Sequence, residues 1–450
     1  MLTSFRLTAA LSLTLLTLIT GCSPESDSSP TSVNEVEEES EKINSVKVVQ
    51  KPEQPLTISP DNPDATTQGK VQQYLKGLAS KGFAKASQGV WMQTGDTLLA
   101  NHQGTIPLPA ASLTKVATSL AALQTFGPDH QFVTLIGATG PIEDGVLRGD
   151  LVIQGGEDPF FVWEEAIALG NSLNQLGIQR VTGNLIISGK FYMNFATDPT
   201  QSGNLLRQGL NAQLWPSEAE TQYRTLPPTT PRPQVIFAGS LQVSPLIPSD
   251  VQPLITHSSF PVAELVKKMN RYSNNKMAEM LANSVGGAQV VAQKAAEAAG
   301  VPPAEIQLIN GSGLGVDNRI SPRAVVAMFK GIERYLEPYQ MNLADVFAVV
   351  GDDEGILDER QLPGKAVVKS GSLNNVSTLA GVLPTKEKGM VWFALMNGGG
   401  NNLEGFRREQ ESLLKEFLTK WGVVQSLPAK LTPNPNRKGK TSSNEIENLR

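Results

Sequence analysis

The segment from Ser112 to Leu123, which reads SLTKVATSLAAL, constrains the fold of this chain more than any other. It is largely apolar, and Gly127-Pro128 follows it as a helix-stop signal. The sequence therefore predicts a helix here, with Ser112 near its N-terminus and Lys115 one turn inside on the same face. A serine hydroxyl is a poor nucleophile until a neighbouring group takes its proton. The segment thus pairs a candidate nucleophile with a candidate base.

Lys115 can act as a base only if its pKa falls from about 10.4 toward neutrality, and burial, nearby positive charge or a helix N-terminus can lower it. The apolar surroundings of the segment favour burial. The spacing alone has little weight, because Ser-x-x-Lys recurs at Ser412 and Lys415 in a predicted amphipathic helix, where we interpret it as solvated surface. The interpretation therefore depends on motifs further along the chain.

A second motif, Lys369-Ser370-Gly371-Ser372, follows a short apolar run with the character of a strand. The lysine supplies charge, the hydroxyls supply direction, and the glycine lets a substrate backbone come close, so the motif suits the capture of a small carboxylate. A backbone N–H just past Gly371 can pair with that of Ser112 to form an oxyanion hole.

A third motif, Ser273-Asn274-Asn275, lies between two predicted helices and has weight only through its position. In this order the three motifs resemble those of the penicillin-recognising serine enzymes. Longer stretches resemble the class C low-molecular-mass penicillin-binding proteins, a family of exported D-Ala-D-Ala carboxypeptidases and endopeptidases. This resemblance covers roughly residues 89–422 and includes GDLVIQGGEDP (149–159), RVTGNL (180–185), GSGLG (311–315) and VKSGSLNNVSTLAG (368–381).

The resemblance implies a catalytic role for four residues. Ser112 is the acylated nucleophile and Lys115 is its general base. Ser273 relays a proton to the leaving amine, and Lys369 tunes that serine. No cofactor is implied.

The resemblance also implies how substrate is held. Asn275 orients the substrate amide, while Ser370, Gly371 and Ser372 form the site for the terminal carboxylate. The N–H groups of Ser112 and Ser372 hold the oxyanion. The partners implied are peptidoglycan stem peptides that end in D-Ala-D-Ala, together with β-lactam antibiotics as covalent inhibitors.

The predicted fold class is α+β, a penicillin-binding or β-lactamase-like transpeptidase fold with an antiparallel sheet, flanking helices and an inserted β-rich domain. Short β-like runs between residues 132 and 239 indicate the insert, and helical periodicity returns after it. The predicted parts are a signal peptide (1–21), a disordered tether (22–67), a serine DD-peptidase domain (68–131 and 256–425), the inserted domain (132–255) and a disordered tail (426–450).

The N-terminus predicts export and membrane attachment. Arg6 and a short apolar core precede Cys22, the only cysteine, in a pattern that resembles the lipobox of bacterial lipoproteins. Lipidation of Cys22 would anchor the chain to a membrane of the cell envelope, facing the periplasm or cell exterior. The net charge of −5 argues against a nucleic-acid partner.

The motifs are also compatible with other functions. A DD-endopeptidase that cleaves peptide cross-links, a β-lactamase and a non-catalytic peptidoglycan-binding protein all fit the same motifs. A catalytic histidine is disfavoured, because His102, His130 and His257 lack a Gly-x-Ser-x-Gly partner. With one cysteine and no paired histidines, the sequence predicts no metal site.

Overall fold

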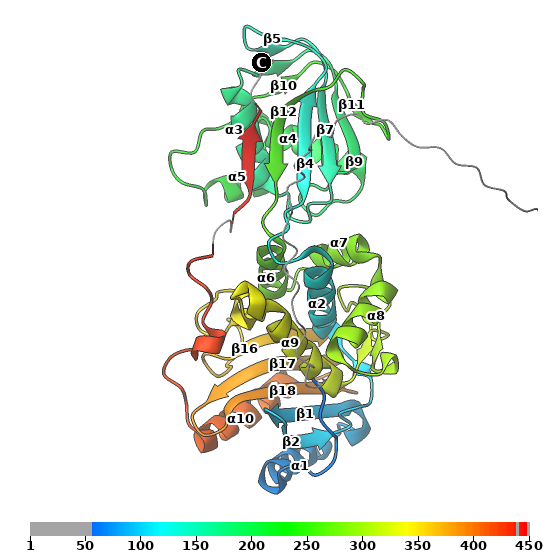
Figure 1. The fold of residues 1–450 in the computed structure, drawn as a ribbon, viewed down its shortest axis with the longest axis vertical. Helices are drawn as coiled ribbons and strands as arrows, with labels where there is room; N and C mark the ends of the chain where they lie inside the picture. Colours follow the sequence, from blue (N-terminus) through cyan, green and yellow to red (C-terminus); the bar gives the residue numbers. More distant parts are fainter. Residues whose placement is uncertain (1–55, 438–440, 448–450) are drawn as a thin grey trace, which may run out of the picture. The chain divides into compact units, whose positions relative to one another are not determined.

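The computed structural model describes residues 56–437 and 441–447 (Figure 1). The predicted signal peptide, Cys22 and most of the predicted tether lie outside these residues. The predicted end of the tether, at residue 67, is wrong, because Leu56 and the start of the first helix already belong to the described fold. The Leu56 side chain is buried in a hydrophobic core. Helix α1 (Ala65–Ser80) begins directly after Asp64, whose side chain accepts a hydrogen bond from the Thr67 N–H. An N-terminal cap of this kind fixes the start of a helix.

The peptidase part is built on a six-stranded antiparallel sheet with the order β15-β16-β17-β18-β1-β2. Its alternating residues face two separate cores: in β1, Val90 and Met92 face one core and Trp91 faces the other. Every residue of β17 is buried, as expected for a central strand covered on both faces. The strands are β1 (Gln88–Thr94), β2 (Thr97–His102), β15 (Ala348–Val349), β16 (Val367–Leu373), β17 (Val376–Thr385) and β18 (Gly389–Gly398).

Helices cover both faces of this sheet (Figure 1). Helices α1 and α10 share one core with it, and the other helices pack around α2, whose residues from Thr114 to Leu123 are all buried. Its buried polar side chains Lys115, Thr118 and Ser119 each have a hydrogen-bond partner. These helices are α2 (Thr114–Phe126), α6 (Val262–Tyr272), α7 (Asn275–Val285), α8 (Ala288–Ala299), α9 (Pro322–Leu336) and α10 (Leu403–Trp421).

A small three-stranded sheet fixes the chain just before the predicted nucleophile. Strand β14 pairs with β3, which leads into the turn η2, and with β13. The loop 307–319 is thereby held close to Ser112. The elements are β3 (Leu108–Pro109), η2 (Ala111–Leu113), β13 (Ile306–Gln307) and β14 (Arg319–Ile320), and shorter 3-10 turns lie at η1 (Lys85–Ser87), η4 (Pro303–Glu305), η5 (Glu337–Tyr339) and η6 (Leu343–Asp345).

The inserted segment has two sheets and a hydrophobic core of its own. Its six-stranded sheet has the order β11-β9-β7-β4-β12-β19, with β11, β9 and β7 parallel, and its four-stranded sheet has the order β10-β8-β6-β5. Three helices pack beside these sheets and share their core. The elements are β4 (Val133–Ala138), β5 (Ile142–Glu143), β6 (Val146–Leu147), β7 (Leu151–Gly156), α3 (Trp163–Gln175), β8 (Arg180–Val181), β9 (Leu185–Lys190), α4 (Pro199–Gly209), η3 (Ala212–Leu214), α5 (Ser217–Tyr223), β10 (Ile236–Phe237), β11 (Leu241–Val243) and β12 (Gln252–Ser258).

The C-terminal residues differ from the prediction of a disordered tail. Turn η7 (Ala429–Leu431) places Leu431 in the peptidase core, fully buried, and β19 (Ser443–Ile446) pairs with β12 of the insert. A polar strand can join a sheet edge because backbone hydrogen bonds, not apolar side chains, hold it there. Composition alone therefore misjudged this segment.

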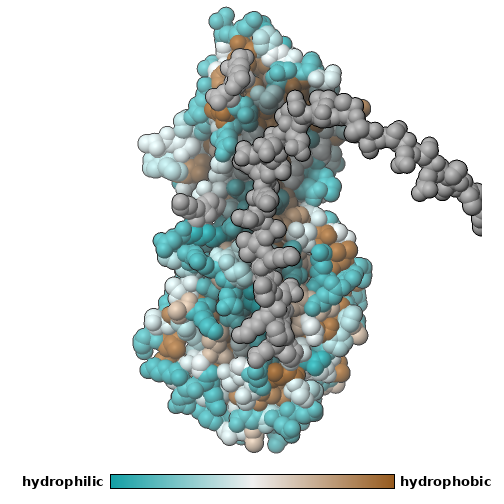
Figure 2. Space-filling view, in the orientation of Figure 1, coloured by the Kyte–Doolittle hydropathy of each residue, from teal (hydrophilic) through white to brown (hydrophobic). Residues whose placement is uncertain are grey.

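The visible face is mostly hydrophilic, with hydrophobic residues scattered over it (Figure 2). Within 56–437 and 441–447, no helix combines the length and the apolar character that crossing a bilayer requires.

Candidate active site

Ser112 lies in the turn η2, directly before α2 begins. The preceding residue, Ala111, has a φ of 46°, in the left-handed region that L-residues rarely adopt. Hydrogen bonds hold this turn: the Ala110 N–H donates to the Asn318 carbonyl (2.8 Å) and the Thr378 hydroxyl donates to the Ala110 carbonyl (3.0 Å). Ser112 therefore lies near the N-terminus of the helix, as the sequence predicts, but Lys115 is only the second residue of α2.

Lys115 is fully buried, and its Nζ contacts three oxygen atoms. They are Ser112 Oγ at 3.0 Å, Asn275 Oδ1 at 2.7 Å and the Ser312 carbonyl at 2.7 Å. Burial lowers the pKa of Lys115 to about 7, although the negative charge of Glu279 opposes the shift. Lys115 thus has the pKa near neutrality that a base for Ser112 needs.

Glu279, for which the sequence predicted no role, holds the loop that supplies the Ser312 carbonyl. The Glu279 carboxylate accepts hydrogen bonds from the N–H groups of Gly311 (3.0 Å) and Ser312 (2.9 Å). Glu279 follows Asn275 by four residues on α7, so both side chains lie on the same helical face. That spacing is visible in the sequence, but its partner loop lies 32 residues further along.

Ser273 and Lys369 form a second pair. Ser273 ends α6 with a φ of 51°, and Lys369 Nζ donates to its Oγ at 2.9 Å and to the Ser370 carbonyl at 2.7 Å. Burial and the nearby charge of Lys115 hold the pKa of Lys369 well below its usual value.

Gly371 brings β16 against the turn that carries Ser112. A Cβ atom at this position would lie 2.6 Å from the Ser112 nitrogen and 2.5 Å from Thr378 Oγ1, so only glycine fits without a shift. Next to it, the Ser370 side chain is buried and Ser372 is exposed. The three motifs, far apart in sequence, therefore converge on one place.

The model of the D-Ala-D-Ala carboxypeptidase 3 (S13) family matches residues 72–213 and 237–420. The chain belongs to this family. It is therefore a serine-type D-Ala-D-Ala peptidase, and the resemblance to the class C low-molecular-mass penicillin-binding proteins is confirmed.

Relatives of this S13 chain are distant in sequence but similar in fold. Carboxypeptidase DacB of Mycolicibacterium smegmatis is 25% identical over an alignment of 337 residues that covers 65% of this chain and 72% of the relative. The predatory endopeptidase Bd0816 of Bdellovibrio bacteriovorus has a TM-score of 0.65 at 19% identity, over 79% of this chain and 99% of that one. The penicillin G-acylated endopeptidase Bd3459 of the same organism has a TM-score of 0.64 at 21% identity, with the same coverage. The predicted fold class is confirmed.

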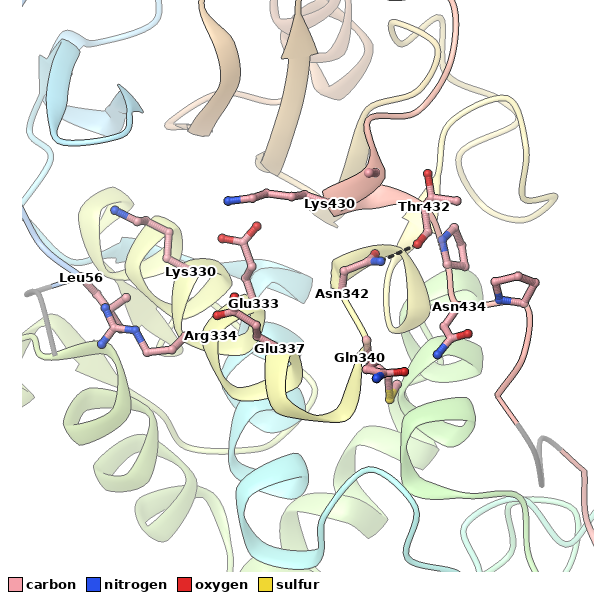
Figure 3. A pocket seen from close by; sticks show the side chains of 14 residues that line it. Leu56, Lys330, Glu333, Arg334, Glu337, Gln340, Asn342, Lys430, Thr432 and Asn434 are labelled. Atoms are coloured by element: carbon pink, nitrogen blue, oxygen red, sulfur yellow. Dashed lines mark hydrogen bonds between the residues drawn. The ribbon is translucent and has the colours of Figure 1, made fainter. Parts of the chain in front are cut away.

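A cavity of about 730 Å³ lies elsewhere in this S13 chain, between α9 and residues 429–435 (Figure 3). Charged side chains line it, among them Lys330, Glu333 and Lys430. None of the eight predicted peptidase-site residues is in its lining. This cavity is therefore separate from the place where the three motifs converge.

Proposed function

We propose that this chain is a D-Ala-D-Ala carboxypeptidase that acts through an acyl-enzyme on Ser112. The observation that carries the proposal is the 3.0 Å contact between Ser112 Oγ and the buried Lys115 Nζ, whose pKa is about 7. At neutral pH a large share of this lysine is uncharged and can accept the serine proton.

The reaction runs in two steps. Neutral Lys115 takes the proton of Ser112 as its Oγ attacks the carbonyl carbon of the penultimate D-alanine. The N–H groups of Ser112 and Ser372 stabilise the oxyanion. Ser273 gives a proton to the departing amine of the last D-alanine, and the proton held by Lys115 replaces it. Water then hydrolyses the ester, which releases the shortened peptide and restores Ser112.

Substrate binding uses the groups around this pair. Asn275 orients the substrate amide, and the hydroxyls of Ser370 and Ser372 receive the terminal carboxylate beside the close approach at Gly371. A β-lactam offers an acyl group and a carboxylate in a comparable arrangement, so Ser112 forms a stable penicilloyl ester. The penicillin G-acylated relative supports this proposal.

Intact mass measurement tests the nucleophile. The protein from residue 23 onward is incubated with penicillin and, separately, with a stem peptide that ends in D-Ala-D-Ala. We expect one penicilloyl adduct per chain, mapped to Ser112, and release of D-alanine. Ser112→Ala should abolish both while its thermal unfolding stays close to that of the wild type. An equally stoichiometric adduct on Ser112→Ala would overturn the assignment.

Endopeptidase action on peptide cross-links is a second candidate, because two proteins of similar fold are endopeptidases. A cross-linked muropeptide dimer separates the two activities. Release of monomers without release of D-alanine from the pentapeptide would favour the endopeptidase.

We also propose that the chain is exported and held at a membrane by a lipid on Cys22. The lipobox-like sequence before Cys22 supports this proposal. Cys22→Ala should move the protein from the membrane fraction to the soluble fraction and remove the lipid mass. Unchanged fractionation, with no lipid mass on the wild type, would contradict the anchor.

A further inference from the structure

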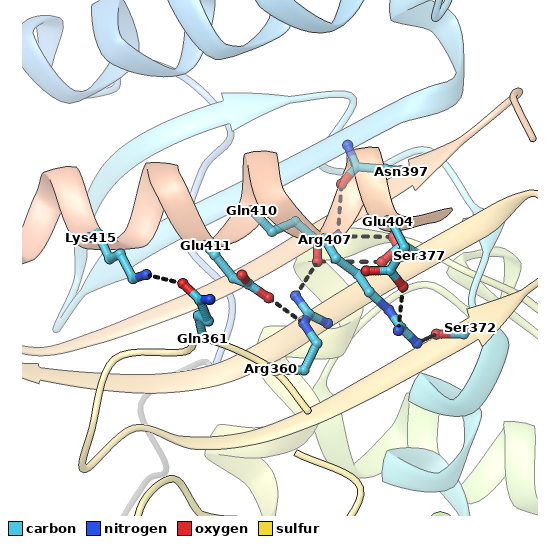
Figure 4. Close-up of polar contacts among 10 residues, drawn as sticks. All are labelled: Arg360, Gln361, Ser372, Ser377, Asn397, Glu404, Arg407, Gln410, Glu411 and Lys415. Atoms are coloured by element: carbon cyan, nitrogen blue, oxygen red, sulfur yellow. Dashed lines mark hydrogen bonds and ion pairs between the residues drawn. The ribbon is translucent and has the colours of Figure 1, made fainter. Parts of the chain in front are cut away.

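Ser372 has a charged partner on α10, a helix that covers the face of the sheet away from α2. Arg407, on α10, donates from Nη2 to Ser372 Oγ at 3.1 Å (Figure 4). Ser372 is exposed and follows Gly371, which touches the Ser112 turn. The guanidinium thus lies at the end of β16 where the proposed function places the substrate carboxylate.

Arg407 has hydrogen-bonding capacity to spare. Its Nη1 pairs with Glu404 Oε1 at 2.7 Å, and its Nη2 has a second N–H beside the one donated to Ser372, while its Nε is buried out of reach of a substrate. The Glu404 side chain is 63% exposed, and an exposed pair at i,i+3 on a helix is weak. A substrate carboxylate can therefore displace Glu404 and form the two-pronged contact that a guanidinium favours.

The buried lysines and Arg407 differ in how firmly each holds a positive charge. Burial lowers the pKa of Lys115 to about 7, so this lysine is not fully charged at neutral pH, and burial and the charge of Lys115 lower the pKa of Lys369 as well. A guanidinium keeps its charge throughout this range. The positive charge that holds the carboxylate is then separate from the neutral amine that takes the serine proton.

The position of Arg407 is fixed by a buried network one turn further along α10. Gln410 donates to the Ser377 carbonyl (3.1 Å) and to Asn397 Oδ1 (2.8 Å), and Glu411 accepts from Arg360 Nε (2.6 Å; Figure 4). Ser377 is the β17 residue directly opposite Ser372 in the ladder. The helix is thus tied to the sheet beside the residue that Arg407 contacts.

We propose that Arg407 binds the free α-carboxylate of the residue that leaves, with Ser372, and so makes the enzyme selective for substrates that carry this carboxylate. Glu404 occupies the guanidinium when no substrate is bound. This inference rests on the proposed role of Ser372 in the S13 site.

Two activated thioester substrates test it. One is an N-acyl-D-alanyl thioglycolate, and the other is the matching thioglycolamide, which lacks the carboxylate. A thioester is reactive enough for acylation to be measured with both. We expect Arg407→Gln to lower kcat/KM for the acid about 10- to 100-fold, the range for a hydrogen bond to a charged group, and to change the amide less than 2-fold. Arg407→Lys should restore part of the selectivity, and Glu404→Gln should lower KM for the acid.

Arg408→Gln is the matched control, because Arg408 is an exposed arginine on the same helix. It should leave both substrates unchanged. Equal losses with acid and amide in Arg407→Gln, or no loss with either, would overturn the role of Arg407 while leaving the acyl-enzyme intact. Absence of acylation in the wild type would instead overturn the proposed function.

Discussion

The chain contains the spacing Ser-x-x-Lys twice, at residues 112–115 and 412–415, and the two copies have opposite surroundings. Lys115 is fully buried and contacts Ser112 Oγ, whereas Lys415 is exposed on α10 and contacts Gln361 at 3.3 Å. Burial disfavours the charged amine of Lys115 and lowers its pKa to about 7. The same local pattern thus pairs a serine with a buried lysine only where the tertiary structure removes that lysine from water.

Replacing each lysine gives the largest expected contrast. Lys115→Met should slow penicillin acylation about 10²- to 10⁴-fold, the range for loss of a general base, and Lys415→Met should have no effect. Because the base is the neutral form, the wild-type acylation rate should rise about tenfold per pH unit below pH 7 and level off above it. Stopped-flow acylation between pH 5 and pH 9 measures both effects. A flat profile would contradict the base role of Lys115.

Gly371→Ala tests the close contact between β16 and the turn of Ser112, which the exposed Ser-x-x-Lys copy at residues 412–415 lacks. The added Cβ would push β16 away from the Ser112 nitrogen, so acylation should fall at least about tenfold and the free energy of unfolding should fall by about 1–3 kcal/mol. Gly364→Ala is the matched control, because nothing lies within 4 Å of a Cβ at that position. Denaturant titration and acylation rates report the two effects. Equal behaviour of both variants would refute the steric argument.

Burial raises the pKa of an acid, whereas it lowers the pKa of a lysine. Glu165 of the insert accepts a hydrogen bond from Ser442 at 2.8 Å, and burial raises its pKa to about 7. His257 nearby is fully buried between Asp158 and Asn444; burial opposes protonation, but the hydrogen bond and charge of Asp158 raise its pKa. Both raised pKa values stabilise the fold below the unfolded pKa, and this stabilisation is lost as pH rises through the folded value.

Glu165→Gln gives the smallest expected effect. From pH 5 to pH 8 the wild type should lose about 1–3 kcal/mol of unfolding free energy through Glu165, and the variant should lose less. Glu218→Gln, at an exposed acid on α5 of the same insert, should behave like the wild type. Thermal unfolding at several pH values measures this. A variant as pH-dependent as the wild type would show that other groups dominate.

The sequence predicted residues that the fold brings together at the candidate site, but not the residues that contact and hold them there. Ser112 and Lys115 are three apart, so a single helical turn brings them together, and Gly371 was predicted from the need for a close approach. The role of Glu279 was missed because its partners are 32 and 33 residues away. Arg407 was missed because it reaches Ser372 from another helix, 35 residues further along.

Sequence by itself determined the largely apolar helix after Ser112, the order of the three motifs and the β-rich segment that follows this helix, because local spacing and periodicity encode these features. The tertiary structure decided the chemical state of the ionisable groups. Burial of Lys115, the guanidinium beside Ser372 and the pairing of the polar C-terminal strand with β12 all depend on contacts between segments far apart in the chain. The pKa of a side chain is set by the water and charge around it, and no local pattern contains that information.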